Sequence, residues 1–355
     1  MHAVPPAIQI SMPPASRPPP IRELHAARRA RRHCAARLAC VVAFAALITS
    51  AWSAEVYPSR PVRMIVPFPP GQAADIFARL LAQRLSETWG QQVVVDNRGG
   101  GAGVPAMLAG KAAAPDGHTL IMATTGTLSI TPYLYATPPY DPLKDFTPVS
   151  NVIVAPLVFT AHPSVTYRNV AELVAAAKKA PGKLMYASPG QGTSQHLTAE
   201  LFAARAGIKL AHLPYKGSAP AIVDLMGGQV LLMIDSVPSA LPQLKSGRIK
   251  AIAVTTSRRI PQLPDVPTIA ESGYPGFEGV GWAGIVVAAG TPPETVERLS
   301  ADIRAALNEP KLRADIIARG GIPDPRTPIN YREFIRSEAE KWARAAKEAQ
   351  VQLEP

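Results

Sequence analysis

Residues 65–85 read IVPFPPGQAADIFARLLAQRL, and this stretch decides the fold class of the chain. An apolar run over 62–68 predicts a buried strand, which ends in two prolines and a glycine. A helix is expected directly afterwards, over 74–89, with apolar side chains on one face and Gly90 as its stop signal. In open α/β sheets, ligands bind beyond the carboxyl ends of the strands. The turn between this strand and this helix is therefore a candidate ligand site.

The same strand, turn and helix pattern continues along the chain. Further strands are expected at 91–97, 118–124, 184–188, 210–215, 229–235, 248–256 and 282–289. Further helices are expected at 104–114, 169–180, 195–206, 219–226, 240–247, 293–308, 310–319 and 330–350. Residues 146–161 hold two apolar stretches that we expect Pro156 to separate. Alternating units of this kind predict an α/β fold with mixed, mainly parallel sheets flanked by helices.

The first 53 residues differ in composition from the rest of the 355-residue chain. They hold seven arginines and one glutamate, a net +6 of the formal +11, so the remaining chain is only mildly basic. Residues 38–51 are apolar but too few for a membrane span, and small residues that suit signal peptidase follow. We expect a signal peptide with an unusually long basic region, cut between Ser53 and Ala54; an N-terminal membrane anchor is the alternative. Both cysteines, Cys34 and Cys40, lie in this leader, so the exported chain has no disulfide.

Two further turns repeat the arrangement of the first. Residues 186–201, YASPGQGTSQHLTAEL, and residues 213–221, LPYKGSAPA, place small or hydroxyl-bearing residues directly before a helix. The first amides of a helix have no partner within it, and the helix dipole adds positive charge there. Such helix starts suit a carboxylate or a phosphate. We therefore expect helix starts from separate halves of the chain to converge on one small anion in a cleft.

Other chemistries find less support in the sequence. It has no phosphate-binding P-loop, no metal-ligand spacing and no pattern typical of nucleic-acid binding, so we predict no cofactor, no metal and no nucleic acid. Ser194 stands two residues before His196, which leaves a serine hydrolase as an alternative, although the nucleophile-elbow motif is incomplete. Asp235, at the end of an expected strand, and Lys216, before an expected helix, are candidates for ligand contacts. An ordinary structural role stays open for both.

Several motifs carry a resemblance to a known family. The stretches YPSRPVRMIVPFPPGQAADIFARLLAQRL, VVVDNRGGGAG, APDGHTLIMAT, YASPGQGTSQHLTAELF, LPYKGSAPAIVDLMGGQV and WAGIVVAAGTPP resemble the Bug family over residues 56–350. These are the extracytoplasmic solute receptors of tripartite tricarboxylate transporters. The resemblance implies a two-lobed periplasmic binding protein of type II, with crossings between the lobes near 152–159 and 278–285. We expect lobe 1 to comprise 54–155 plus 280–355, and lobe 2 to comprise 156–279.

The resemblance also implies a function. Family members bind small carboxylates, so we expect an organic acid or an acidic amino acid in the interlobe cleft, held by backbone amides and hydroxyls. The ligand would then pass in the periplasm to the permease subunits of a tripartite tricarboxylate transporter. We expect a monomer with no catalytic residue; a sensor that presents the ligand to a signalling partner is an alternative. The predicted ligand-binding residues are Phe68, Gly71, Gln72, Ala73, Ala74, Thr124, Thr125, Gly126, Ser188, Gly190, Gly192, Thr193, Ser194, Tyr215, Lys216 and Asp235.

The sequence departs from the family pattern at some positions. Gln72 stands where a second glycine is usual, and its side chain is expected either to reach into the cleft or to cap the helix. Leu128 stands near a common histidine, and Leu231 replaces a frequent aspartate. These differences leave the amide cradle in place. They affect the part of the cleft that selects the ligand.

Overall fold

The structure, a computed structural model, describes residues 57–351 of the chain. The predicted signal peptide and its cleavage site lie outside these residues. The described residues belong to one compact unit. Among the described helices, none combines the length and the apolar character that crossing a membrane requires.

Strands and helices alternate from the start of the described chain, as the sequence predicts. The strands are β1 (Val62–Val66), β2 (Val93–Asn97), β3 (Thr119–Thr124), β4 (Phe146–Ala161), β5 (Met185–Ser188), β6 (Ala211–Pro214), β7 (Leu232–Ser236), β8 (Lys250–Val254), β9 (Val280–Ala288) and β10 (Ile322–Pro323). The helices are α2 (Ala73–Trp89), α3 (Val104–Lys111), α4 (Thr131–Leu134), α5 (Val170–Lys179), α6 (Ser194–Ala206), α7 (Ser218–Met226), α8 (Val237–Lys245), α9 (Pro293–Asn308), α10 (Pro310–Ala318) and α11 (Pro328–Glu348). Two short helical turns, η1 (Gly101–Gly103) and η2 (Gly126–Ile130), complete the described elements.

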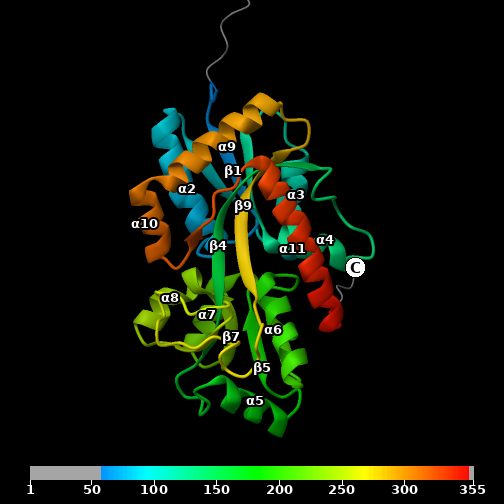
Figure 1. Ribbon diagram of the computed structural model, residues 1–355, viewed down its shortest axis with the longest axis vertical. Coiled ribbons are helices and arrows are strands. Elements are labelled where there is room, and N and C mark those ends of the chain that lie inside the picture. Colours follow the sequence, from blue (N-terminus) through cyan, green and yellow to red (C-terminus); the bar gives the residue numbers. More distant parts are fainter. Residues whose placement is uncertain (1–56, 352–355) are drawn as a thin grey trace, which may run out of the picture. The chain divides into compact units, whose positions relative to one another are not determined.

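The strands form one path in the order β2-β1-β3-β9-β4-β7-β5-β6, with β8 and β10 also paired to β4. Neighbouring strands are parallel within β2-β1-β3 and within β7-β5-β6, whereas β9 and β4 run antiparallel to their neighbours. Figure 1 shows β4 and β9 running between an upper group of elements around β1 and a lower group around β5 and β7. We call these groups the first lobe and the second lobe. The predicted two-lobed α/β fold with mixed sheets and flanking helices is confirmed. The sheets are less parallel than expected, because every pair that involves β4 or β9 is antiparallel.

The expected break at Pro156 is wrong, because β4 runs unbroken through this residue. Residues 146–156 of the strand pair with β9, and residues 157–161 pair with β7. Proline has no N–H to give to a ladder, so strands tolerate it where a hydrogen bond is not required. Here it lies at the change of partner, where its missing donor interrupts neither ladder. A single long strand therefore connects the two lobes.

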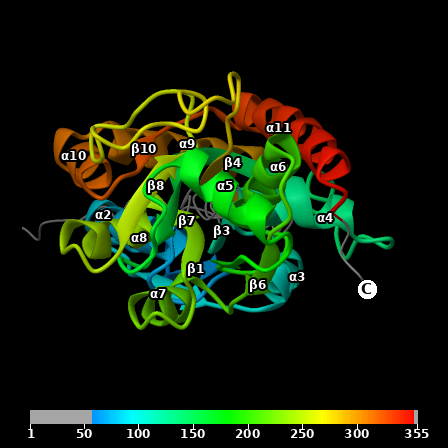
Figure 2. The same cartoon turned by 90° about the horizontal axis from the view of Figure 1, so that it is seen from below.

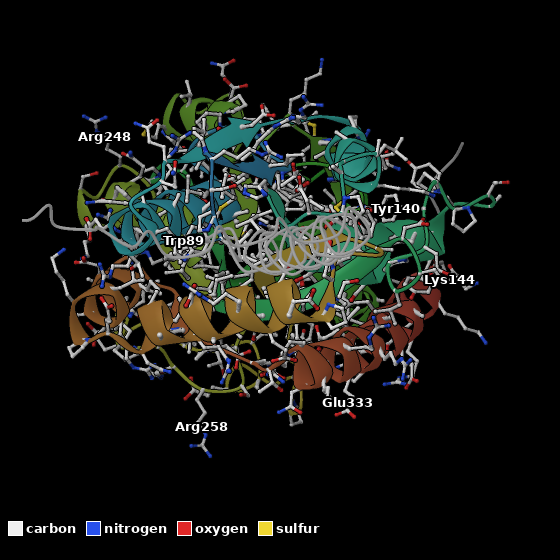
Figure 3. The ribbon with its side chains drawn as sticks, turned by 90° about the horizontal axis from the view of Figure 1, so that it is seen from above. Trp89, Tyr140, Lys144, Arg248, Arg258 and Glu333 are labelled. Atoms are coloured by element: carbon white, nitrogen blue, oxygen red, sulfur yellow. The ribbon has the colours of Figure 1, made fainter. Side chains whose placement is uncertain are left out.

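Helix α2 has the apolar face and the glycine stop that its sequence predicts. Phe77, Leu81 and Leu85 are buried in the core of the first lobe, and the helix ends at Gly90. This glycine has a left-handed φ of 65°, and its N–H bonds the carbonyl of Ser86, which is a common helix stop. Helix α9 covers the same core through its apolar face. Charged side chains such as Arg248 and Arg258 project away from the molecule in Figure 3.

Helix α11 connects the lobes in a second way. It runs beside α6, which both views show (Figures 1 and 2). Trp342, Ala345 and Ala346 near its end pack in the core of the second lobe, with Phe202 of α6. The predicted lobe bounds place this whole helix in lobe 1; those bounds stay a prediction.

Candidate functional site

The turn between β1 and α2 is held in shape by Asp75. Its carboxylate accepts hydrogen bonds from the N–H of Gly71 (3.0 Å), Nε of Arg79 (3.0 Å) and Nδ2 of Asn97 (2.8 Å). The same Asn97 nitrogen also donates to the carbonyl of Phe68 (2.9 Å), so both ends of the turn are fixed. The first bond of the helix runs from the N–H of Ile76 to the carbonyl of Gln72. The preceding amides therefore have no acceptor within the helix.

The start of α6 is built in a similar way. Thr193 caps the helix, because its hydroxyl oxygen accepts from the N–H of His196 (3.3 Å) and donates to the carbonyl of Gly190 (2.7 Å). The first helical bond runs from Leu197 to Thr193, so the amides of Ser194 and Gln195 lack an intrahelical acceptor. Two helix starts with free amides thus exist, one in each lobe.

These two helix starts line the same small cavity, which we call the central cavity. Its volume is about 40 Å³. Its walls are Phe68, Gln72, Ala73, Ala74, Thr124, Thr125, Gly126, Ile153, Ala155, Leu157, Thr193, Ser194, Gln195, Ser236, Gly281, Trp282 and Ala283. No residue of this set carries a charged side chain. Any negative charge placed there would be met by main-chain N–H groups and hydroxyls.

A second space, the outer groove, shares Phe68 and Thr193 with the central cavity. It has a volume of about 230 Å³. Its remaining walls are Pro69, Gly100, Gly101, Ala102, Gly103, Tyr135, Pro189, Gly190, Gln191, Tyr215, Lys216 and Gly217. Lys216 is the charged side chain of this set.

The sequence-predicted residues divide between these spaces. Phe68, Gln72, Ala73, Ala74, Thr124, Thr125, Gly126, Thr193 and Ser194 line the central cavity. Gly190, Tyr215 and Lys216 line the outer groove instead. Gly71, Ser188, Gly192 and Asp235 line neither, although an added Cβ on Gly126 would lie 3.3 Å from the carbonyl oxygen of Gly192.

The residues that sequence reasoning missed come mainly from β4 and β9. Ile153, Ala155 and Leu157 belong to the first of these strands, and Gly281, Trp282 and Ala283 to the second. The available signal was the pair of predicted lobe crossings, since strands that cross between lobes must pass the cleft. Gly281 has a specific reason to be small, because an added Cβ would lie 3.1 Å from Oγ of Ser194.

Ser194 and His196 do not form a nucleophile and base pair. Oγ of Ser194 donates to Oε1 of Gln195 (3.1 Å), whereas Nδ1 of His196 accepts from the N–H of Gly192 (3.3 Å). The His196 ring stacks on His212 with 4.1 Å between centroids, and Nε2 of His212 bonds the hydroxyl of Ser188 (2.7 Å). Burial lowers the pKa of His196 to about 3, with a smaller contribution from His212, whose own pKa burial lowers to about 4. Both rings are therefore neutral at pH 7 and serve to hold the 188–196 segment.

Asp235 lies behind the cavity wall and is fully buried. Its Oδ1 accepts from Oγ of Ser218 (2.9 Å) and from the N–H of Ser236 (2.7 Å). Its Oδ2 has no hydrogen-bond partner among residues 57–351. Burial raises the pKa of this carboxyl to about 7, and the hydrogen bonds oppose the rise. Through its hydrogen bond to the N–H of Ser236, this carboxyl helps to orient Ser236, which lines the central cavity.

Metal chemistry has no set of side chains to support it in the part of the chain that the structure describes. No three His, Cys, Asp or Glu side chains gather there in a group that could hold a metal ion. What the geometry offers is two helix starts, one from each lobe, and a set of hydroxyls around one small cavity.

Such a site on a two-lobed α/β fold defines a solute-binding receptor. Residues 77–351 match the family model described as the tripartite tricarboxylate transporter family receptor. The chain belongs to this family, and the resemblance seen in the sequence is confirmed.

Individual relatives agree with this assignment. Protein BugT of Bordetella pertussis is 39% identical over 302 residues, which cover 85% of this chain and 93% of that protein. The structure of Rpa4515 from Rhodopseudomonas palustris with adipate is 37% identical, with a TM-score of 0.81, over 83% of this chain and 99% of that one. The structure of MatC from the same organism with bound malate is 31% identical, with a TM-score of 0.77, over 81% of this chain and 99% of that one.

Proposed function

We propose that this protein captures a small carboxylate, an organic acid or an acidic amino acid, in the central cavity. The observation that carries this proposal is that the starts of α2 and α6, one from each lobe, line the same space. Each start offers free N–H groups and the positive end of a helix dipole. A carboxylate has enough lone pairs to accept from both starts together. The cavity is then the interlobe cleft that the sequence predicts.

The proposed role extends to transport. Adipate and malate in the related structures support a carboxylate as the class of ligand. We propose that the signal peptide sends the protein to the periplasm, where the loaded receptor delivers its ligand to permease subunits of a tripartite tricarboxylate transporter. Recognition and delivery need no chemical step, which fits the absence of a pair between Ser194 and His196.

Binding in this cavity requires motion of the lobes. A cavity needs about 10–15 Å³ to hold one water molecule, so a volume of about 40 Å³ has room for only a few. A dicarboxylate is larger than this, so the cavity must widen to admit it. We propose that the lobes open about β4 and β9 and close on the ligand, which is the hinge behaviour of two-lobed binding proteins.

A thermal-shift screen of the exported chain, residues 54–355, tests the function directly. The panel is mono- and dicarboxylic acids of two to six carbons, with and without hydroxyl or amino substituents. A ligand present at 100 times its dissociation constant adds ~2.7 kcal/mol to stability, which raises the unfolding temperature by a few degrees. The proposal is rejected if no acid of the panel produces a shift while phosphate or a neutral sugar does.

A charge placed beside the two helix starts tests the site itself. We expect Gly192→Asp to weaken carboxylate binding about 100-fold or more in calorimetry, because it adds a negative charge one residue before Thr193, the N-cap of α6. Gly192→Asn is the matched control: it carries the same left-handed backbone strain, since φ is 73°, but no charge. Equal affinities in the two variants would remove this loop from the binding site.

A further inference from the structure

Gln72 is the polar side chain of the central cavity that lacks a protein partner. It occupies the N-cap position of α2 with an extended backbone, φ −83° and ψ 155°, but its side chain does not cap the helix. It is only 5% exposed and it lines the cavity. Its Oε1 is buried without a hydrogen-bond partner among residues 57–351. Of the two roles expected from the sequence for this side chain, capping of the helix is therefore wrong, whereas the residue does border the cavity.

An unpaired amide in this position is unfavourable for the folded protein. A primary amide has two N–H donors and an oxygen with two lone pairs, and burial removes the water that would otherwise satisfy them. Such groups are rare in folded proteins unless another molecule supplies the partner.

The other polar side chains of the cavity already have partners in the protein. Oγ1 of Thr125 accepts from the N–H of Trp282 (2.7 Å), and Nε1 of Trp282 donates to Glu338 (3.0 Å). Oγ of Ser194 donates to Oε1 of Gln195 (3.1 Å). The hydroxyls of Thr124, Thr193 and Ser236 each bond a neighbouring residue. Gln72 thus differs from the rest of the wall, since its amide is free to bond a ligand.

The donors and acceptors of the cavity define the ligand more narrowly than the proposed function, which names only a carboxylate. The inference rests on that proposed function. The helix-start amides offer only donors, which suit the carboxylate. Gln72 adds an acceptor, and it directly precedes Ala73, one of the residues at that helix start. We infer that Gln72 selects carboxylates that carry a hydrogen-bond donor, a hydroxyl or an ammonium group, close to the bound carboxyl group. Its amide nitrogen meets the carboxylate, and its oxygen accepts from the neighbouring donor.

Calorimetry with matched acids tests this inference. The three series are propionate, lactate and alanine; succinate, malate and aspartate; and glutarate, 2-hydroxyglutarate and glutamate. Within each series that binds, we expect a substituted acid to bind the exported chain about tenfold or more tightly than the unsubstituted one, because the latter leaves Gln72 unpaired. The hydroxyl and amino members show which donor the site prefers.

Two variants connect the preference to this side chain. Gln72→Met keeps the length of the side chain without its polar atoms, and we expect the affinities within a series to differ by less than about threefold. Gln72→Gly serves the same purpose if the methionine variant unfolds, since the extended backbone there accepts any residue. Gln83→Met makes the same change on the exposed face of α2 and should keep the full preference.

The outcomes separate this inference from the proposed function. If the unsubstituted acids bind as tightly as the substituted ones, or if Gln72→Met keeps the preference, the inference is wrong while the carboxylate receptor stands. If no acid of any series binds, the proposed function fails and the inference fails with it.

Discussion

Two buried ionisable groups near the site, Asp235 and His196, give opposite dependences of stability on pH. The pKa of Asp235 is raised to about 7 in the folded protein, so the folded state holds more protons than the unfolded state between about pH 4 and pH 7. Its contribution to stability is therefore lost as pH rises through that window. The pKa of His196 is lowered to about 3, so the unfolded state holds more protons below about pH 6.5. Its contribution to stability is lost as pH falls.

We predict that single substitutions separate these two contributions. Asp235→Asn keeps the acceptor for Ser218 and removes the contribution to stability that decreases as pH rises. Stability should therefore rise more steeply from pH 4.5 to pH 6.5 than in the wild type. His196→Asn keeps an acceptor for Gly192 and removes the contribution to stability that increases as pH rises. Stability should therefore rise less steeply over this pH range than in the wild type. Each change should be about 2 kcal/mol across this range, as measured by urea unfolding at both pH values. If both variants retain the wild-type slope, neither group is perturbed in the folded protein.

At the scale of elements, the starts of the helices divide into those that only stabilise and those that also form the site. Asn169 caps α5: its Oδ1 accepts from the N–H of Glu172 (2.9 Å), and Glu172 in return accepts from the N–H of Arg168 (2.7 Å). Glu172 thus bonds the N–H that precedes the cap, an arrangement similar to a capping box, on the surface of the second lobe. Thr193 caps α6 in a comparable way, but it also borders both the central cavity and the outer groove.

We therefore predict different consequences for the loss of these two caps. Asn169→Ala and Thr193→Ala should each lower the free energy of unfolding by about 1 kcal/mol, because each leaves a helix-start N–H without its acceptor. Only Thr193→Ala should also weaken carboxylate binding, by about threefold or more, since it removes the shorter of the two hydroxyl bonds to the carbonyl of Gly190 and loosens the turn. Denaturant unfolding and calorimetry measure the two effects, and Thr193→Ser should restore both. Equal binding by both alanine variants would show that the cap does not shape the site.

The elements that sequence reasoning predicted well are those with a strong local signal. The apolar face of α2 and its stop at Gly90, and the bounds of α9, follow from residue spacing and helix-end chemistry. The continuity of β4 through Pro156 has no such signal, because the effect of a missing N–H depends on which strand lies opposite. Trp282 was missed for a related reason: a run that is apolar throughout does not show which side of a strand faces a cavity.

On the scale of the whole molecule, the two lobes meet through their loops. Pro69 of the β1–α2 turn lies against Gly217 at the start of α7, so that a Cβ on this glycine would be 3.1 Å from Cγ of the proline. Gly126 after β3 approaches the turn that precedes α6, where an added Cβ would lie 3.3 Å from the carbonyl oxygen of Gly192. Both contacts join segments that belong to opposite lobes. The first contact lies at the outer groove, and Gly126 of the second lines the central cavity.

We predict that Gly217→Ala weakens carboxylate binding about tenfold, because the added methyl group meets Pro69 and reduces the fraction of molecules that can close. The substitution also introduces backbone strain, since φ is 110° at this position. Gly182→Ala controls for strain alone, because φ is 74° there and nothing lies within 4 Å of the added Cβ; its affinity should be unchanged. Adding Pro69→Ala to Gly217→Ala removes the ring that the methyl group meets, so calorimetry should show part of the affinity restored. A double variant that binds no better than Gly217→Ala would mean that these loops do not meet in the ligand complex.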